Sequence, residues 1–256
     1  MLFYDTHTHL YLEEFAVDRQ ETIQRAVEAG VDKFFLPNID STSIEGMLQM
    51  EKDFPRRCFP MMGLHPCSVK GNYQTQLKEV KNWLDKHKFY AIGEIGIDLY
   101  WDKTFEEEQK TVFKEQIILA KKHKLPIVIH LRNAFDETFE IVEQLNDANL
   151  KGIFHCFSGT KEQAEKIISL GGFKLGIGGV VTFKNAGLDK AIMDINPEHL
   201  VLETDSPYLA PVPFRGKRNE SAYLLLVAQK LAEIYNLPLE KIASITTANA
   251  NEVFDI

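Results

Sequence analysis

The chain has 256 residues, of which 45% are hydrophobic, and it carries a formal net charge of −8 at pH 7. This composition is that of a globular protein, and the negative charge argues against a protein that coats nucleic acid through non-specific phosphate contacts. No apolar run is long enough to cross a bilayer, and Asp5 and His7 lie where a secretory signal would need its apolar core. The three cysteines show no Cys-x-x-Cys spacing, which favours reduced thiols in a cytoplasmic protein.

Short apolar segments alternate with amphipathic segments along the whole sequence. The first apolar segment (LFY) leads into His7 and His9. Further strands are expected at 31–37, 58–64, 90–97, 126–131, 151–154, 173–177 and 200–204. Helices are expected at about 18–28, 41–52, 74–87, 105–122, 133–146, 160–170, 185–194, 221–235 and 239–254.

Strands that alternate with helices predict an α/β protein with a parallel sheet, because parallel neighbours need crossover connections. A count of eight strands fits a closed (β/α)₈ TIM barrel, here as a single domain over residues 1–256. An open doubly wound sheet is the alternative. It would normally bring a glycine-rich phosphate loop after its first strand, and the sequence has none there.

Most of the histidines and several acids lie where the predicted strands end. Five of the eight histidines do so, whereas solvated histidines would scatter over the helices. Since the carboxyl ends of the strands form one face of a TIM barrel, these side chains are expected to meet there. The residues at strand ends are His7, His9, His65, Glu94, Asp98, His130, His155, Glu203 and Asp205.

Two features of this set favour a metal centre. His7 and His9 are two residues apart on a strand, so both imidazoles project from one face. Glu94 lies in an otherwise apolar strand, where an uncompensated carboxylate would be prohibitively costly to bury. Four imidazoles and two carboxylates are enough for two divalent ions that share a carboxylate, and such donors suit zinc, manganese, cobalt or magnesium. Taken singly, His130 and His155 would fit buried, hydrogen-bonded histidines equally well.

Cationic and aromatic residues follow the same strands. Arg132 comes after the fifth strand, and the segment RGKRN after the eighth strand contains Arg215 and Arg218. Guanidinium groups at the rim of a metal centre suit phosphate oxygens, although the RGKRN segment alone would also fit a solvated turn. Tyr100 and Trp101, after the fourth strand, would either stack on a base or cover the barrel mouth.

Eight segments carry a combined likeness to one family. They are DTHTHL (5–10), GLHP (63–66), GEIGID (93–98), IH (129–130), HCFSG (155–159), ETDSPY (203–208), RGKRN (215–219) and TANANEVF (247–254). Together they resemble the TatD-type metal-dependent deoxyribonucleases, which are amidohydrolase-like TIM barrels. One departure is Ser221, where relatives usually carry proline. Glu94 at the end of the fourth strand also separates this chain from those amidohydrolases that use a modified lysine as the bridge between metals.

The resemblance implies a cytoplasmic enzyme that hydrolyses phosphodiester bonds, often from the 3′ end of DNA. Single-stranded DNA or another phosphodiester is then the expected partner; no membrane association is expected, and the protein is expected to be a monomer. The resemblance also implies a site for two divalent metal ions with Glu94 as the bridge. The implied ligands are His7, His9, Glu94, His130, His155 and Asp205.

The hypothesis for the reaction is metal-assisted attack of water on phosphorus. Asp205 would take the proton of the water as general base, and His65 would hydrogen-bond the substrate or assist the leaving group. Arg132, Arg215 and Arg218 would hold phosphates. The same chemistry would serve a hydrolase of carboxylic esters, amides or lactones, such as an aminoacyl ester, because the barrel does not fix the substrate. A non-catalytic metal-binding protein is a third alternative.

Overall fold

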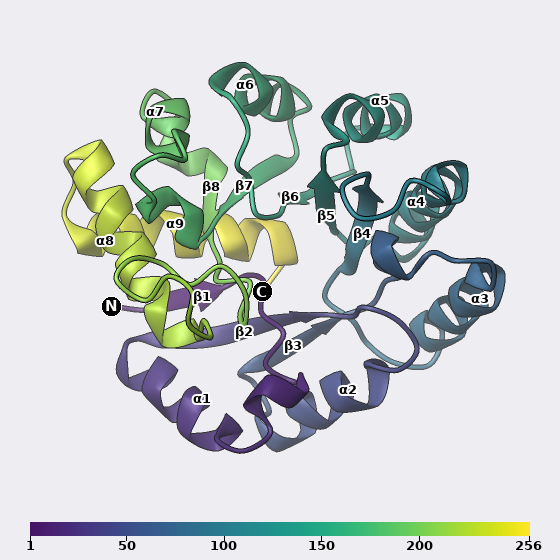
Figure 1. The fold of residues 1–256 in the computed structure, drawn as a ribbon, viewed down its shortest axis with the longest axis horizontal. Coiled ribbons are helices and arrows are strands. Elements are labelled where there is room, and N and C mark those ends of the chain that lie inside the picture. The colour runs from purple at the N-terminus through teal and green to yellow at the C-terminus, as the bar shows by residue number, and fades with distance from the viewer.

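The computed structural model describes all 256 residues as a ring of strands surrounded by helices (Figure 1). The strands are β1 (Phe3–Asp5), β2 (Val31–Pro37), β3 (Cys58–Met61), β4 (Ile92–Asp98), β5 (Ile127–Arg132), β6 (Gly152–Phe154), β7 (Phe173–Ile177) and β8 (Leu200–Leu202). The helices are α1 (Arg19–Glu28), α2 (Ile44–Asp53), α3 (Tyr73–Leu84), α4 (Glu106–His123), α5 (Phe135–Leu145), α6 (Lys161–Ser169), α7 (Leu188–Ile192), α8 (Leu224–Tyr235) and α9 (Leu239–Phe254).

Backbone contacts close the ring. All neighbouring strands run parallel, in the order β1-β2-β3 and β4-β5-β6-β7-β8. Met62, just past β3, forms a parallel bridge with Ile92 of β4. Between β8 and β1, the Thr6 N–H donates to the Leu202 carbonyl at 3.0 Å. The predicted (β/α)₈ barrel is therefore confirmed, and an open sheet is excluded because it would leave two unpaired edges.

The interior of the barrel is apolar at the end where the strands begin. Alternate residues of a strand point inward, so Phe35 of β2 belongs to the interior cluster while Phe34 packs outward under the helices. Helix α9 closes this end, since Phe254 stacks on Phe35 with ring centroids 3.8 Å apart. The Asn249 amide of α9 donates to the carbonyl of Leu200, the first residue of β8, at 2.7 Å.

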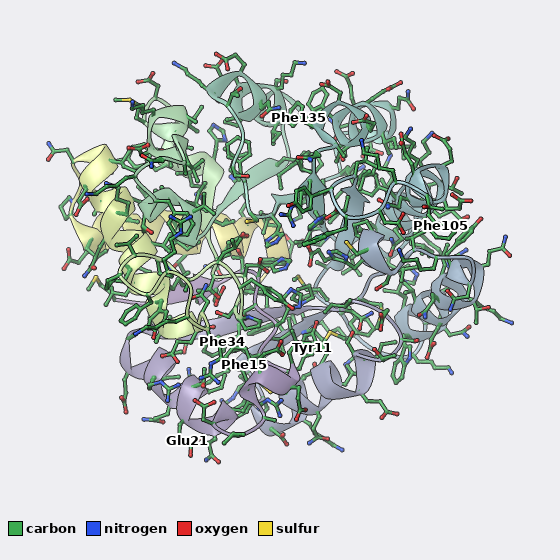
Figure 2. All side chains as sticks on the ribbon, viewed as in Figure 1. Tyr11, Phe15, Glu21, Phe34, Phe105 and Phe135 are labelled. Carbon is green, nitrogen blue, oxygen red and sulfur yellow. The ribbon has the colours of Figure 1, made fainter.

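The outer helices turn their apolar faces toward the strands and their charged faces outward. Figure 2 shows Glu21 of α1 at the periphery, whereas Phe34 lies further inside. Helix α4 has three glutamates in its first turn, and Lys121, Lys122 and His123 in its last, which is the charge order that complements the helix dipole. None of the helices combines the length with the apolar character that crossing a bilayer would take.

The predicted elements agree with the structure to within three residues at each end, and two of the differences have local causes. The helix expected at 185–194 is only Leu188–Ile192, because Gly187 adopts a left-handed φ of 72° and the helix begins after it. The strand expected at 200–204 ends at Leu202. The chain leaves strand geometry there, and Asp205 has a positive φ of 57°.

Candidate metal centre

The inward-facing positions change from apolar to polar toward the carboxyl ends of the strands. Val128 of β5 and Ile153 of β6 belong to the interior apolar cluster. His130 and His155 lie two residues further along and therefore point the same way. Successive layers of the barrel interior thus consist first of aliphatic side chains and then of imidazoles.

One group of predicted ligands surrounds one oxygen of Glu94. Its Oε2 atom lies 3.1 Å from His7 Nε2 and 3.6 Å from His9 Nε2. The Oδ1 atom of Asp205 lies 3.6 Å from His9 Nε2 and 3.8 Å from His7 Nε2. These residues are far apart in sequence: His7 and His9 follow β1 and Asp205 follows β8, which are neighbours in the ring, whereas β4, which supplies Glu94, is next to neither.

A second group surrounds the other oxygen. Glu94 Oε1 lies 2.7 Å from His130 Nδ1, 3.2 Å from His65 Nε2 and 3.7 Å from His155 Nε2. His155 Nε2 is also 3.8 Å from Asp205 Oδ1. The structure therefore brings all six predicted ligands and His65 together, and the Glu94 carboxylate lies between the two groups.

The spacing of these atoms fits divalent metal ions. Ligands at about 2.0–2.2 Å from a tetrahedral ion are separated from one another by roughly 3.4 Å. Six of the separations around Glu94 and Asp205 run from 3.1 to 3.8 Å. Glu94 is only 3% exposed, and a buried carboxylate needs nearby positive charge. The six predicted ligands, all nitrogen or oxygen donors, thus fit the expected pair of ions.

In the protein alone, the imidazoles and carboxylates compensate one another. Burial would raise the pKa of Glu94, but the imidazoles of His65 and its neighbours outweigh burial and hold that pKa well below its usual range. Burial likewise works against protonation of His155, yet the Glu203 carboxylate raises its pKa to about 10. Divalent cations would replace protons on these rings, because a ligating imidazole must be neutral.

Glu203 holds the His155 ring from behind. Its Oε1 atom lies 2.8 Å from His155 Nδ1 and accepts a hydrogen bond from the Cys156 N–H at 2.6 Å. A carboxylate behind a ligand histidine fixes the ring and raises its basicity. Gly176 leaves room for it, since a Cβ there would lie 2.1 Å from Glu203 Oε2. Sequence reasoning placed Glu203 at a strand end without a role; its position two residues before Asp205 was the available signal.

Two further support residues were also missed. Asp98 Oδ2 lies 2.9 Å from His130 Nε2, and the Tyr11 hydroxyl lies 2.8 Å from His9 Nδ1. The sequence places Asp98 at a strand end but indicates no function for it, and Tyr11 lies two residues past His9 on the same chain segment. Three of the four predicted ligand histidines therefore have a polar group on the ring nitrogen that faces away from Glu94.

A buried network ties the first strand to the segment after β8. Asp5 accepts hydrogen bonds from the Thr204 N–H at 2.9 Å, the Thr204 hydroxyl at 2.6 Å and the Ser221 hydroxyl at 2.6 Å. Ser221 is the position that departs from the usual family pattern. Here it supplies a hydroxyl group where proline has none, so the departure adds a contact beneath the candidate metal centre.

His65 differs from the other histidines in its hydrogen bonds. Its Nδ1 atom accepts the Cys67 N–H at 3.1 Å. A neutral ring that accepts through Nδ1 carries its proton on Nε2, and that atom faces Glu94 at 3.2 Å. His65 therefore presents a proton donor at the edge of the site.

The three predicted phosphate-binding arginines lie in different surroundings. Arg132 is exposed and lies over the Tyr100 ring, 3.7 Å from its centroid, and Arg215 lies 4.6 Å from the centroid of Phe183. Neither forms an ion pair within the protein. Arg218, in contrast, donates two hydrogen bonds of 2.7 Å to the carboxylate of Asp18. Its guanidinium group is thus held by the protein and not presented freely at the rim.

Comparison with known proteins agrees with this geometry. The sequence profile described as TatD related DNase matches residues 4–255. The chain is 39% identical to YabD, an uncharacterized metal-dependent hydrolase of Bacillus subtilis, with 100% of both chains covered. It superposes on the crystal structure of YjjV, a TatD homolog from Escherichia coli, with a TM-score of 0.93 and 30% identity over 99% of this chain and 98% of that one.

A more distant structure shares the fold. An uncharacterized amidohydrolase from Saccharomyces cerevisiae superposes with a TM-score of 0.83 at 19% identity, over 99% of this chain and 100% of the other. The profile match covers nearly the whole barrel, and the barrel mouth holds the histidines and acids that the family resemblance implied. The chain belongs to the TatD-related DNase family.

Proposed function

We propose that this protein, a metal-dependent hydrolase of the TatD family, removes nucleotides from the 3′ end of single-stranded DNA by hydrolysing phosphodiester bonds. The proposal depends on one observation, which is the position of the buried histidine and carboxylate cluster beside an exposed cationic and aromatic rim. The cluster suits attack by water, and the rim suits a polyanion with stacked bases.

The ligands divide between two ions around Glu94. His7, His9 and Asp205 would hold one ion, and His130 and His155 would hold the other. When bound, the two ions lower the pKa of water toward neutrality and offset the negative charge that grows on the phosphoryl group. Glu203 and Asp98 would keep the His155 and His130 rings oriented, at 2.8 and 2.9 Å from their outer nitrogens.

Two side chains have positions suited to proton transfer. Asp205 is the more open of the two central carboxylates, 15% exposed against 3% for Glu94, so its carboxylate is the one that incoming water reaches. We assign it as the general base. His65, with its proton on Nε2, would donate to a phosphate oxygen or to the leaving oxygen.

The rim provides contacts for the rest of the strand. Trp101 is 69% exposed and Tyr100 is 51% exposed, so both rings can be reached from solvent. Their rings would stack on bases, which every base sequence permits. Arg132, stacked on Tyr100 and free of acidic partners, and Arg215 would hold phosphates. Arg218 is not assigned to phosphate binding, because its guanidinium group is paired with Asp18.

The decisive test is digestion of a 5′-labelled single-stranded oligonucleotide. The protein is treated with a chelator, and magnesium, manganese, cobalt or zinc is then added back separately. The proposal predicts a ladder that shortens from the 3′ end, appears only with added metal and slows as salt is raised, because phosphate contacts release counterions. A panel of carboxylic esters, amides and lactones is assayed in parallel. Metal-dependent turnover of one of these with intact DNA would refute the nuclease assignment and leave the metal-dependent hydrolase in place.

A further inference from the structure

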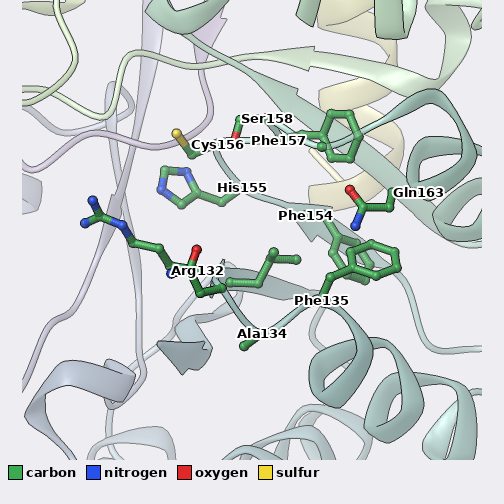
Figure 3. Close-up of a pocket in the computed structure, with 12 residues that line it drawn as sticks. Arg132, Ala134, Phe135, Phe154, His155, Cys156, Phe157, Ser158 and Gln163 are labelled. Carbon is green, nitrogen blue, oxygen red and sulfur yellow. The ribbon is translucent and has the colours of Figure 1, made fainter. Parts of the chain in front are cut away.

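A cavity opens beside the candidate metal centre. It lies between the segments that follow β5 and β6, has a volume of about 430 Å³, and includes His155 and Arg132 in its lining (Figure 3). This volume is in the range of small-molecule sites, roughly 300–1,000 Å³. The rings of Phe135 and Phe157 form part of the cavity wall, so the cavity offers apolar surface next to the candidate ligand His155, which also lines it.

One polar side chain of the cavity is fixed in orientation. The Oε1 atom of Gln163 accepts the Thr160 N–H at 3.0 Å, while the Gln163 N–H donates to the Thr160 hydroxyl, which together form the capping box of α6. Because the oxygen is used, the free end of the side chain is Nε2, a donor without a partner in the protein. Figure 3 shows this nitrogen directed toward Phe154, on the cavity side. Gly159 makes room for the arrangement, since a Cβ there would lie 2.3 Å from Gln163 Oε1.

We propose that this cavity is the subsite for the terminal nucleobase, with the ring against Phe135 and Phe157 and a carbonyl at ring position 4 of thymine accepting a hydrogen bond from Gln163 Nε2. The inference rests on the proposed nuclease function. His155 connects the two sites, since its Nε2 faces Glu94 and Asp205 while the residue also lines the cavity. A nucleotide with its 5′-phosphate at the metal centre would place its base beside this wall. Flat aromatic surface with a single amide donor suits a base better than an aliphatic chain.

The sharpest test replaces the donor by an acceptor. Gln163→Glu retains the capping box, because glutamate serves at this position as well, but it presents an oxygen to the cavity. Thymine has a carbonyl acceptor at ring position 4, and cytosine has an amino donor there. Binding of thymidine 5′-monophosphate and deoxycytidine 5′-monophosphate to the metal-loaded protein is measured by calorimetry. The thymine-to-cytosine affinity ratio should fall by roughly tenfold in the variant, as one hydrogen bond is lost and another gained.

Two further variants control the result. Gln74→Glu adds the same charge at an exposed position in the first turn of α3, which lines no part of this cavity, and should leave the ratio unchanged. Phe135→Leu should weaken both nucleotides without affecting deoxyribose 5-phosphate, which has no base. An unchanged ratio in Gln163→Glu, or no binding of thymidine 5′-monophosphate, would overturn the subsite. If the ratio shifts but DNA stays intact in the digestion assay, the subsite is supported and the nuclease proposal fails; if DNA is cleaved with an unchanged ratio, only the subsite fails.

Discussion

Replacing Glu203 by glutamine should weaken metal binding and leave the barrel folded. The side chain is fully buried, and its Oε1 atom lies within hydrogen-bond distance of both His155 Nδ1 and the Cys156 N–H, at 2.8 and 2.6 Å. A glutamine retains that oxygen. Its amide nitrogen replaces Oε2, which has no hydrogen-bond partner in the protein, so the packing against Gly176 is preserved. What the variant loses is the negative charge behind the His155 ring.

The size of the effect follows from the change of this polar contact from a charged to a neutral one. Hydrogen bonds to charged groups contribute about 1.5–3 kcal/mol and neutral ones about 0.5–1.5 kcal/mol, so the difference is about 1–1.5 kcal/mol. The dissociation constant for the metal should therefore rise about tenfold, at the lower end of the 10- to 100-fold range typical of such outer partners. Competition against a chromogenic chelator measures this constant, and urea unfolding of the metal-free protein shows whether the fold is intact.

Glu240→Gln is the matched control. Glu240 is exposed in the first turn of α9 and makes no hydrogen bond, so its replacement removes the same charge far from the barrel mouth. Equal metal affinity in Glu203→Gln and in the unaltered protein would refute the idea that the Glu203 charge supports His155. A large loss of stability in metal-free Glu203→Gln would instead show that the side chain matters mainly to the fold.

Four other outcomes are expected. Asp205→Asn should lower turnover by about 10²–10⁴-fold with an unchanged unfolding midpoint, because asparagine tolerates the left-handed φ of 57°; near-normal turnover would exclude the general-base role. Trp101→Ala should cost about 1–3 kcal/mol of single-stranded DNA affinity, measured by fluorescence anisotropy, without a change in thermal stability; unchanged affinity would remove this ring from the DNA path. The Arg218 guanidinium, with Arg25, holds the pKa of Asp18 below its usual range, so this contact stabilises the protein above about pH 4 and is lost as pH falls further. Urea unfolding should then show a shallower acid decline in Asp18→Asn, and parallel curves would contradict this. Chelation should lower the thermal midpoint, since a metal present at a concentration of 100 times its dissociation constant increases the free energy of unfolding by about 2.7 kcal/mol. Identical midpoints with and without chelator would argue against a resident metal.

The convergence of the candidate metal ligands was predictable because it depends on rules that act along single strands. Glu94 was identifiable as a carboxylate within an apolar strand, and His130 and His155 followed from the rule that strand ends of a barrel share one face. The partners behind these rings were not predictable. Whether Glu203 lies behind His155 depends on how neighbouring strands are staggered and rotated, and the residues of one strand do not determine either quantity.

Contacts between surface segments that are distant in sequence could not be predicted either. The sequence shows Arg218 in a basic segment, which suggested a free cation, whereas the fold places Asp18, 200 positions away, directly against it. The donor in the cavity is a third case, because only the capping box determines which end of the Gln163 amide is free. In each case the residue type was visible in the sequence and the partner that decides its role was not.

Helix α9 has a consequence for biosynthesis. Phe254 rests on Phe35 inside the barrel, and Val253 belongs to the same interior cluster. The first strands therefore leave the ribosome long before the residues that complete their packing. Until α9 is synthesised, part of their apolar surface is exposed to solvent. We would look for chaperone dependence in this interval of synthesis, and for a nascent chain that gains protease resistance only after Leu239–Phe254 has emerged.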